Sequence, residues 1–151
     1  MSTITVRQAT LSDLDALVPL FDAYRQFYGR ASDTDAVRDF LLARANHGES
    51  VLFIAFDGVQ PVGFTQLYPS FSSISLARTF VLNDLYICES ARRKGLASQL
   101  LAAAVGFART VGAVRLSLST ATTNSAAQAV YEAAGWKRDE QYFVYDFAIS
   151  A

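Results

Sequence analysis

The sequence predicts an α/β protein in which helices flank one mixed, mostly antiparallel sheet. Two observations support this prediction. Strand-like and helix-like patterns follow one another in the order β-α-α-β-β-β-α-β-α-β. A long helical segment also separates two strands in the second half, which predicts a parallel pair, whereas the short turn at Asp57 and Gly58 predicts an antiparallel hairpin.

The first half of the chain begins with alternating residues and continues with helical spacing of apolar residues. Ser12, with Asp15 three positions later, is expected to cap the first helix, and Ser32 the second. The expected elements are a strand over residues 3–9, helices over 12–29 and 32–48, and strands over 50–56 and 60–69.

The second half contains a largely apolar strand, an Ala/Leu-rich helix and three further elements. The expected elements are a strand over residues 79–88, a helix over 96–113, a strand over 114–120, a helix over 124–135 and a closing strand over 141–149.

Length and composition limit the class of protein. With 151 residues we expect one domain over residues 1–151, and a formal charge of −1 argues against a nucleic-acid partner that needs a broad positive field. The lone Cys88 excludes an internal disulfide framework and a zinc ribbon, and we expect no metal. No signal-peptide pattern or bilayer-length apolar run is present, so we expect a cytoplasmic protein with no membrane partner.

The motif "RRKGLA", residues 92–97, lies where the strand over 79–88 gives way to the long helix. The first N–H groups of a helix are unpaired and carry partial positive charge, so phosphate oxygens bind there when no side chain blocks them. Gly95 and Ala97 keep that approach open, and the three cations before them favour an anion. The alternative is a solvated basic turn that needs Gly95 only for its φ angle and binds no anion.

The pattern Arg92-x-x-Gly95-x-Ala97 resembles the acetyl-coenzyme A signature of the GNAT superfamily of N-acetyltransferases. The later block "NSAAQAVYEAAGW" is similar to a second family motif, and the element order agrees over nearly the whole chain. With "YRQFYG" and "LNDLY", the chain resembles the branch that acetylates histone tails, polyamines and other small amines. The resemblance implies the GNAT fold, with a splayed pair of central parallel strands, and acetyl-CoA as co-substrate.

The resemblance also implies a coenzyme site. Main-chain groups of Leu85, Tyr86 and Ile87 are expected to align the pantetheine arm. The pyrophosphate is expected on Arg92, Arg93, Lys94, Gly95, Leu96, Ala97 and Ser98. Asn124 and Tyr131 are expected near the thioester, with Tyr131 as general acid. The alternatives are that Tyr131 is a core side chain and that Asn124 is only a helix cap.

The acceptor side is less well defined by its motifs. The glutamate that some relatives carry before the signature is absent, and Asp84 is the nearest substitute for a general base. In a regular strand Asp84 shares a face with Leu82 and Tyr86, whereas a bulge reverses that relation. A structural role for Asp84 is the alternative. Tyr24, Phe27 and Tyr28 are expected to wall the acceptor, or else to belong to the core.

The function expected from these motifs is transfer of acetyl from acetyl-CoA to a primary amine of a small molecule or polyamine, by direct attack in a ternary complex. One alternative is a CoA-binding sensor or partner-binding subunit without turnover. A second is a protein or peptide amine acetyltransferase. By resemblance we also expect a homodimer.

Overall fold

The computed structural model describes residues 3–150, which fall into two compact units, Met1–Ser119 and Thr120–Ala151. The second unit holds one helix, α4 (Ser125–Ala133). No helix of the described residues is both long enough and apolar enough to cross a membrane. The elements of the first unit are β1 (Ile4–Gln8), α1 (Leu14–Phe27), α2 (Thr34–Asn46), β2 (Val51–Asp57), β3 (Gln60–Ser72), β4 (Ala77–Ile87), α3 (Leu96–Thr110) and β5 (Arg115–Ser117).

The described strands form one sheet in the order β1-β2-β3-β4-β5. The first four pair antiparallel, and β4 pairs parallel with β5, so the expected α/β fold with a mixed, mostly antiparallel sheet is confirmed. The parallel pairing covers only Thr79–Val81 and Arg115–Ser117. Since β4 continues to Ile87, its far half has no described strand on that edge.

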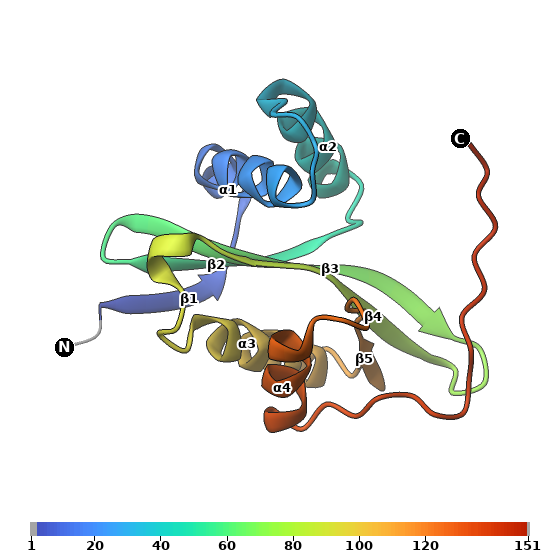
Figure 1. The fold of residues 1–151 in the computed structure, drawn as a ribbon. Helices are drawn as coiled ribbons and strands as arrows, with labels where there is room; N and C mark the ends of the chain where they lie inside the picture. The colour runs from blue at the N-terminus through green and yellow to red at the C-terminus, as the bar shows by residue number, and fades with distance from the viewer. Residues whose placement is uncertain (1–2, 151) are drawn as a thin grey trace. The chain divides into compact units, whose positions relative to one another are not determined.

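Helices cover both faces of this sheet. Figure 1 shows α1 and α2 on one face and α3 on the other. On the α3 side, the ring of Phe107 contacts Phe53 and Phe80, at 5.8 and 5.5 Å between ring centroids. The α1 side holds a core of buried side chains from α1, α2, β2 and β3: Leu17, Val18, Leu20, Phe21, Val37, Leu41, Ile54 and Phe64.

The polar side chains at the start of α1 differ from the expected arrangement. A short 3₁₀ helix over Leu11–Asp13 precedes α1, and the capping box joins Thr10 to Asp13 instead of Ser12 to Asp15. The Asp13 carboxylate accepts the Thr10 N–H at 2.8 Å and pairs with the Arg7 guanidinium at 2.8 Å. These hydrogen bonds, with Arg7 first, lower the pKa of Asp13 to about 2. The Arg7 pair therefore ties β1 to the start of α1.

A buried carboxylate fixes the turn between α1 and α2. Asp22 accepts the Ser32 hydroxyl at 2.7 Å and the Asp33 N–H at 2.8 Å, and both bonds lower its pKa. Asp33 caps α2 by accepting the Ala36 N–H at 3.1 Å, so the expected cap at Ser32 is wrong. Because the Ser32 hydroxyl is bonded to Asp22, the next residue, Asp33, caps the helix instead.

The expected closing strand over residues 141–149 is also wrong. These residues belong to no helix or strand, and the side chains of Tyr142, Phe143, Val144, Tyr145, Phe147 and Ile149 are exposed. The N–H groups of Gln141 and Tyr142 bond to the Asp139 carboxylate, at 2.9 and 3.2 Å. A strand requires a partner as well as an apolar sequence, and no described strand pairs with this segment.

Candidate functional site

The loop before α3 has the backbone that a phosphate site needs. Gly95 has φ +78° and is the residue from which α3 begins, and Arg93 also has a positive φ, +65°. A Cβ at Gly95 would meet no heavy atom of the described residues within 4 Å, so space remains in front of the helix. The first N–H bonded to the loop is that of Gln99, to Gly95 O at 3.1 Å. The N–H groups of Leu96, Ala97 and Ser98 have no acceptor among the described residues.

The three cations of the loop have different positions. The Arg92 side chain turns to the end of β4, where Nε donates to Ile87 O at 2.9 Å. Its guanidinium lies 5.5 Å from the Phe27 ring centroid and 5.8 Å from that of Tyr86. Arg93 and Lys94 are exposed. Arg92 thus joins α1, β4 and the loop, while the other two cations remain in solvent.

The end of β4 packs closely against β3 and leaves its other edge open. A Cβ at Gly63 would lie 2.8 Å from Tyr86 O and 2.8 Å from Ile87 Cδ1, so only glycine allows this approach. The Cys88 N–H donates to Val62 O at 2.9 Å and extends the pairing. Leu85, Tyr86 and Ile87 are half-buried on the stretch of β4 that β5 does not reach. An extended ligand chain would find unpaired main-chain groups there.

A β-bulge determines which way Asp84 points. Gln66 pairs with Asp84 and Leu67 with Leu82, so Asn83 is the extra residue of β4. Leu82 follows Phe80 by two positions and shares its α3 side, whereas Asp84 and Tyr86 lie on the α1 side. The bulged arrangement is therefore the correct one of the two that the sequence allowed.

Asp84 is 5% exposed and belongs to a polar network in the sheet. Its Oδ2 accepts Gln66 Nε2 at 2.8 Å, and its Oδ1 accepts Asn83 Nδ2 at 3.2 Å. Gln66 Nε2 also donates to the Tyr68 hydroxyl at 3.0 Å. Burial first, and then the Asp84 charge, raise the pKa of Tyr24 and raise that of Tyr68 to about 12. Two phenols that stay neutral at neutral pH therefore flank the Asp84 side chain.

The three aromatic residues proposed as an acceptor wall form one chain of rings. Tyr24 contacts Tyr28 at 5.2 Å and Tyr86 at 6.1 Å between centroids, and Tyr28 contacts Phe27 at 5.4 Å. Phe27 is 65% exposed and Tyr28 66%, whereas Tyr24 is half-buried. The stripe thus starts in the core and ends as an accessible surface beside Arg92.

Asn124 precedes α4 and Tyr131 lies on it, both in the second unit. The Asn124 side chain accepts the Ala127 N–H at 3.1 Å and caps the helix. The Tyr131 ring lies 6.3 Å from that of Trp136. Capping accounts for an asparagine at the start of α4, while the chemical roles of both residues stay predictions.

Sequence reasoning missed Gln66 and Tyr68. Their signal was a polar side chain within an otherwise apolar strand, "VGFTQLY", because a fully buried glutamine needs partners on all its polar atoms. Ser50 supplies one of them by donating to Gln66 Oε1 at 2.7 Å. The described residues contain no group of three or more His, Cys, Asp or Glu side chains that could hold a metal ion.

Comparisons with known proteins identify the family of the chain. Residues 17–136 match the acetyltransferase (GNAT) family. The chain is 43% identical over 148 residues to the uncharacterized N-acetyltransferase YhfO of Bacillus subtilis (strain 168), covering 98% of this chain and 99% of that one. A crystal structure described as a probable acetyltransferase is 45% identical, with a TM-score of 0.92 over 97% of this chain and 99% of that chain.

Another solved structure is similar in fold. The aminoglycoside N-acetyltransferase AAC(6')-Iy, solved in complex with CoA, is 21% identical, with a TM-score of 0.80 over 97% of this chain and 96% of that chain. The family match covers well over half of the chain and includes the loop before α3. The chain therefore belongs to the GNAT family and is an N-acetyltransferase, a class of enzyme that uses acetyl-CoA.

Proposed function

We propose that the protein transfers acetyl from acetyl-CoA to a primary amine of a small molecule, of which polyamines are one class. The observation that supports this most directly is the set of unpaired N–H groups at Leu96, Ala97 and Ser98, close in sequence to the open stretch of β4. The pyrophosphate would bind at these N–H groups, and the pantetheine arm along Leu85–Ile87.

The chemistry is direct attack in a ternary complex. The neutral amine nitrogen attacks the thioester carbonyl carbon, the C–S bond breaks, and coenzyme A leaves as a thiolate. The amine loses a proton, whose final acceptor is Asp84. Because the Asp84 carboxylate is only 5% exposed, the Tyr24 hydroxyl relays the proton from the amine to it. Tyr131 supplies the proton that the thiolate takes up.

An acceptor-panel assay tests this function. Purified protein with acetyl-CoA and single amines should release a free thiol, which a chromogenic disulfide detects. Acetyl-CoA alone should raise the melting temperature. At a hundredfold excess over its Kd, the free energy of unfolding should increase by about 2.7 kcal/mol. A thermal shift without thiol release from any amine would favour the CoA-binding sensor. Release only with peptides would favour a protein or peptide acceptor.

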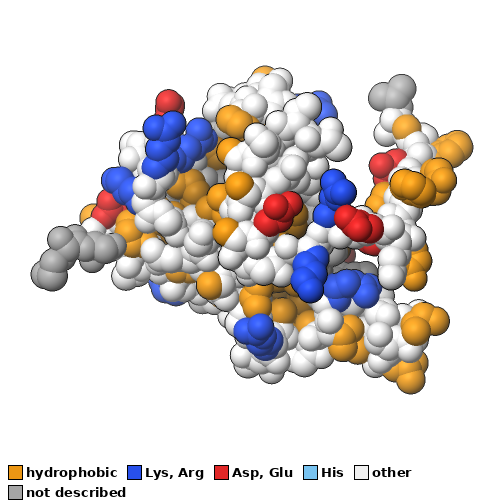
Figure 2. Space-filling model, turned by 60° about the horizontal axis from the view of Figure 1, so that its bottom comes forward, with side chains coloured by type: hydrophobic (Ala, Val, Ile, Leu, Met, Phe, Trp, Pro, Cys, Tyr) orange, Lys and Arg blue, Asp and Glu red, His pale blue; other side chains and the backbone are white. Residues whose placement is uncertain are grey.

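We further propose that the chain forms a homodimer. The support is the segment over residues 141–149, whose large apolar side chains are between 76% and 91% exposed. Figure 2 shows these side chains projecting along the segment next to the C-terminus. A contiguous exposed apolar stretch of this kind is typical of an interaction surface. A second copy of the chain is the partner that accounts for it most simply.

A further inference from the structure

The segment over residues 141–149 has the sequence of a strand and lacks the neighbours of one. Its only main-chain hydrogen bonds to described residues are those of the Gln141 and Tyr142 N–H groups to the Asp139 carboxylate. None of the residues that the structure describes in the second unit, 120–150, is buried, including the apolar side chains of α4. A unit of this size is too small to bury a core of its own, so it needs a partner surface.

The sheet of the first unit ends at β5, and the outer edge of β5 is open. β5 pairs with β4 on one side, and no described strand lies on its other side. Leu116 lies opposite Phe80 and therefore faces α3, yet it is only half-buried. Val114, two positions earlier, is 54% exposed. An end strand with no buried side chain, in a sheet that helices cover on both faces, indicates a missing neighbour.

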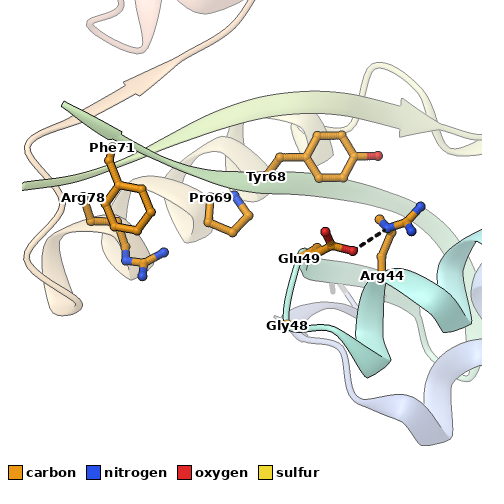
Figure 3. Close-up of a pocket in the computed structure, with 7 residues that line it drawn as sticks. All are labelled: Arg44, Gly48, Glu49, Tyr68, Pro69, Phe71 and Arg78. Carbon is orange, nitrogen blue, oxygen red and sulfur yellow. Dashed lines mark hydrogen bonds and ion pairs between the residues drawn. The ribbon is translucent and has the colours of Figure 1, made fainter. Parts of the chain in front are cut away.

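The other open stretches of the sheet fit an apolar strand less well. β1 carries the exposed Arg7, whose ion pair holds the start of α1. β3 pairs with β2 only along its first part, and a cavity of about 440 Å³ lies beside the rest (Figure 3). Arg44, Glu49 and Arg78 line this cavity, and Pro69 has no N–H to donate to a sheet. Since the open stretch of β4 is proposed for the coenzyme, β5 is the edge that remains.

The side chains of the segment match those of β5. Asp146 is the only charged residue of the segment and Arg115 the only one of β5, and neither forms an ion pair with a described residue. Because side chains alternate between the two faces of a strand, placing Arg115 opposite Asp146 puts Leu116 on the face of Tyr145 and Phe147. A shift of one residue would place the arginine opposite an apolar side chain, so the charges select the register.

We propose that residues 141–149 of one copy add as a strand to β5 of a second copy, and that the exchange is reciprocal about a two-fold axis. In its own chain the segment pairs with no described strand. Its four aromatic rings would bury roughly 600–1,000 Å² per copy. Two such contacts reach roughly 1,200–2,000 Å², the size of a stable interface. The inference deepens the homodimer proposed above and rests on it.

Reversing the charges of the proposed pair tests the exchange. Arg115→Glu and Asp146→Lys, both at exposed positions, should each raise the dimer Kd roughly 10-fold, because both contacts of the dimer then oppose like charges. In an equimolar mixture of the two variants, both contacts of the mixed dimer join opposite charges. The mixed dimer should therefore form with about the wild-type Kd. Sedimentation velocity measures the Kd, and native mass spectrometry separates the mixed dimer from the two homodimers.

The matched controls are Arg109→Glu on α3 and Asp39→Lys on α2, which reverse exposed charges elsewhere. Alone and mixed, they should dimerise as the wild type does. The exchange is overturned if the mixture of Arg115→Glu and Asp146→Lys forms no more mixed dimer than chance gives, as expected when each segment folds back on its own β5. It is also overturned if the single variants keep the wild-type Kd. A dimer without this rescue contradicts only the exchange, whereas a monomeric wild type contradicts the homodimer as well.

Discussion

Asp84 lies on the α1 side of the sheet because Asn83 adds one residue to β4. Without the bulge its carboxylate would point to the α3 side, where Phe53, Phe80 and Phe107 pack. On the α1 side it has Gln66 and Asn83 as donors and two phenols as neighbours. A buried carboxylate with directed donors suits both a proton acceptor and a structural anchor, and a single substitution distinguishes these roles.

Asp84→Asn should preserve the fold and lower turnover by roughly 10²- to 10⁴-fold at neutral pH, because the amide cannot accept the amine proton. Turnover should recover partly as pH rises and supplies free amine. The pH profile of kcat/KM measures this effect. Asp39→Asn, on the exposed side of α2, is the matched control. A variant that loses thermal stability and keeps the wild-type profile would make Asp84 structural, and Glu140 would be the next candidate base.

Tyr131→Phe removes one phenolic proton donor and little volume, so coenzyme binding should be kept. Turnover should fall by roughly 10²-fold or more if protonation of the thiolate limits the rate. Pre-steady-state thiol release measures the chemical step directly. Wild-type rates in the variant would leave Tyr131 with a packing role beside Trp136, whose ring lies 6.3 Å away.

At the scale of elements, α3 is delimited by two glycines of nearly equal backbone conformation. Gly95 precedes its first turn at φ +78°, and Gly112 follows its last at φ +76°. A Cβ at either glycine would meet no heavy atom of the described residues within 4 Å. Gly95→Ala and Gly112→Ala should therefore each cost only the strain of the left-handed conformation, about 1 kcal/mol. Only the first faces the proposed phosphate site, and the pair therefore separates strain from ligand binding.

Gly95→Glu should abolish the acetyl-CoA-dependent rise in melting temperature, because it places a carboxylate where the pyrophosphate binds. Gly112→Glu should destabilise the protein to a similar extent and keep the full ligand-dependent shift. Differential scanning fluorimetry with and without acetyl-CoA compares the two. Equal shifts in both variants would remove the loop over residues 92–98 from the coenzyme site.

The junction of β1 and α1 should make stability dependent on pH. The pKa of Asp13 is lowered from 3.8 to about 2 in the folded chain, chiefly by its hydrogen bond to Arg7. A carboxylate with a lowered folded-state pKa stabilises the protein fully above its unfolded value and loses that contribution as pH falls toward 2. Asp13→Asn should therefore melt below wild type at pH 6, and the two melting curves should converge near pH 2. A constant difference across that range would contradict the assignment.

Sequence patterns predicted the elements of the first unit because they reflect burial: helical spacing reflects one buried face in α1, and apolar runs reflect strands buried at successive residues in β2 and β3. The Gly95 loop was predictable because its backbone needs glycine. The bulge at Asn83 stayed one of two alternatives, because an extra residue leaves apolar composition unchanged. Arg44 and Arg78 were missed because they are 34 positions apart in sequence, and only the fold brings them to one cavity.

At the scale of the whole molecule, residues 141–149 are the segment that most favours association of the chain. Successive residues of this segment are apolar, a sequence pattern typical of a strand buried on two sides. Such a segment left in water costs free energy and promotes association. Residues 3–119 and 120–150 are each compact, so any partner of the segment affects assembly as well as stability.

The double variant Phe143→Asp/Phe147→Asp should shift the protein from dimer to monomer at micromolar concentration and lower its melting temperature, since charge replaces two apolar side chains of the proposed interface. Sedimentation velocity over a concentration series measures the mass. Val59→Asp, at a 96% exposed position in the β2–β3 turn, is the control and should stay dimeric. A wild-type chain that is monomeric at every concentration would contradict the homodimer.

The contact at Gly63 has a consequence for how variants of this enzyme would behave in a genetic screen. Any side chain there must displace the main-chain oxygen of Tyr86 and the side chain of Ile87, on the stretch of β4 proposed for the coenzyme. Gly63 would therefore score as intolerant although it touches no reactant, and selection for milder alleles should recover second-site changes that trim Ile87. Such suppressor pairs would show that the enzyme depends on the close spacing of β3 and β4, which the catalytic side chains alone do not reveal.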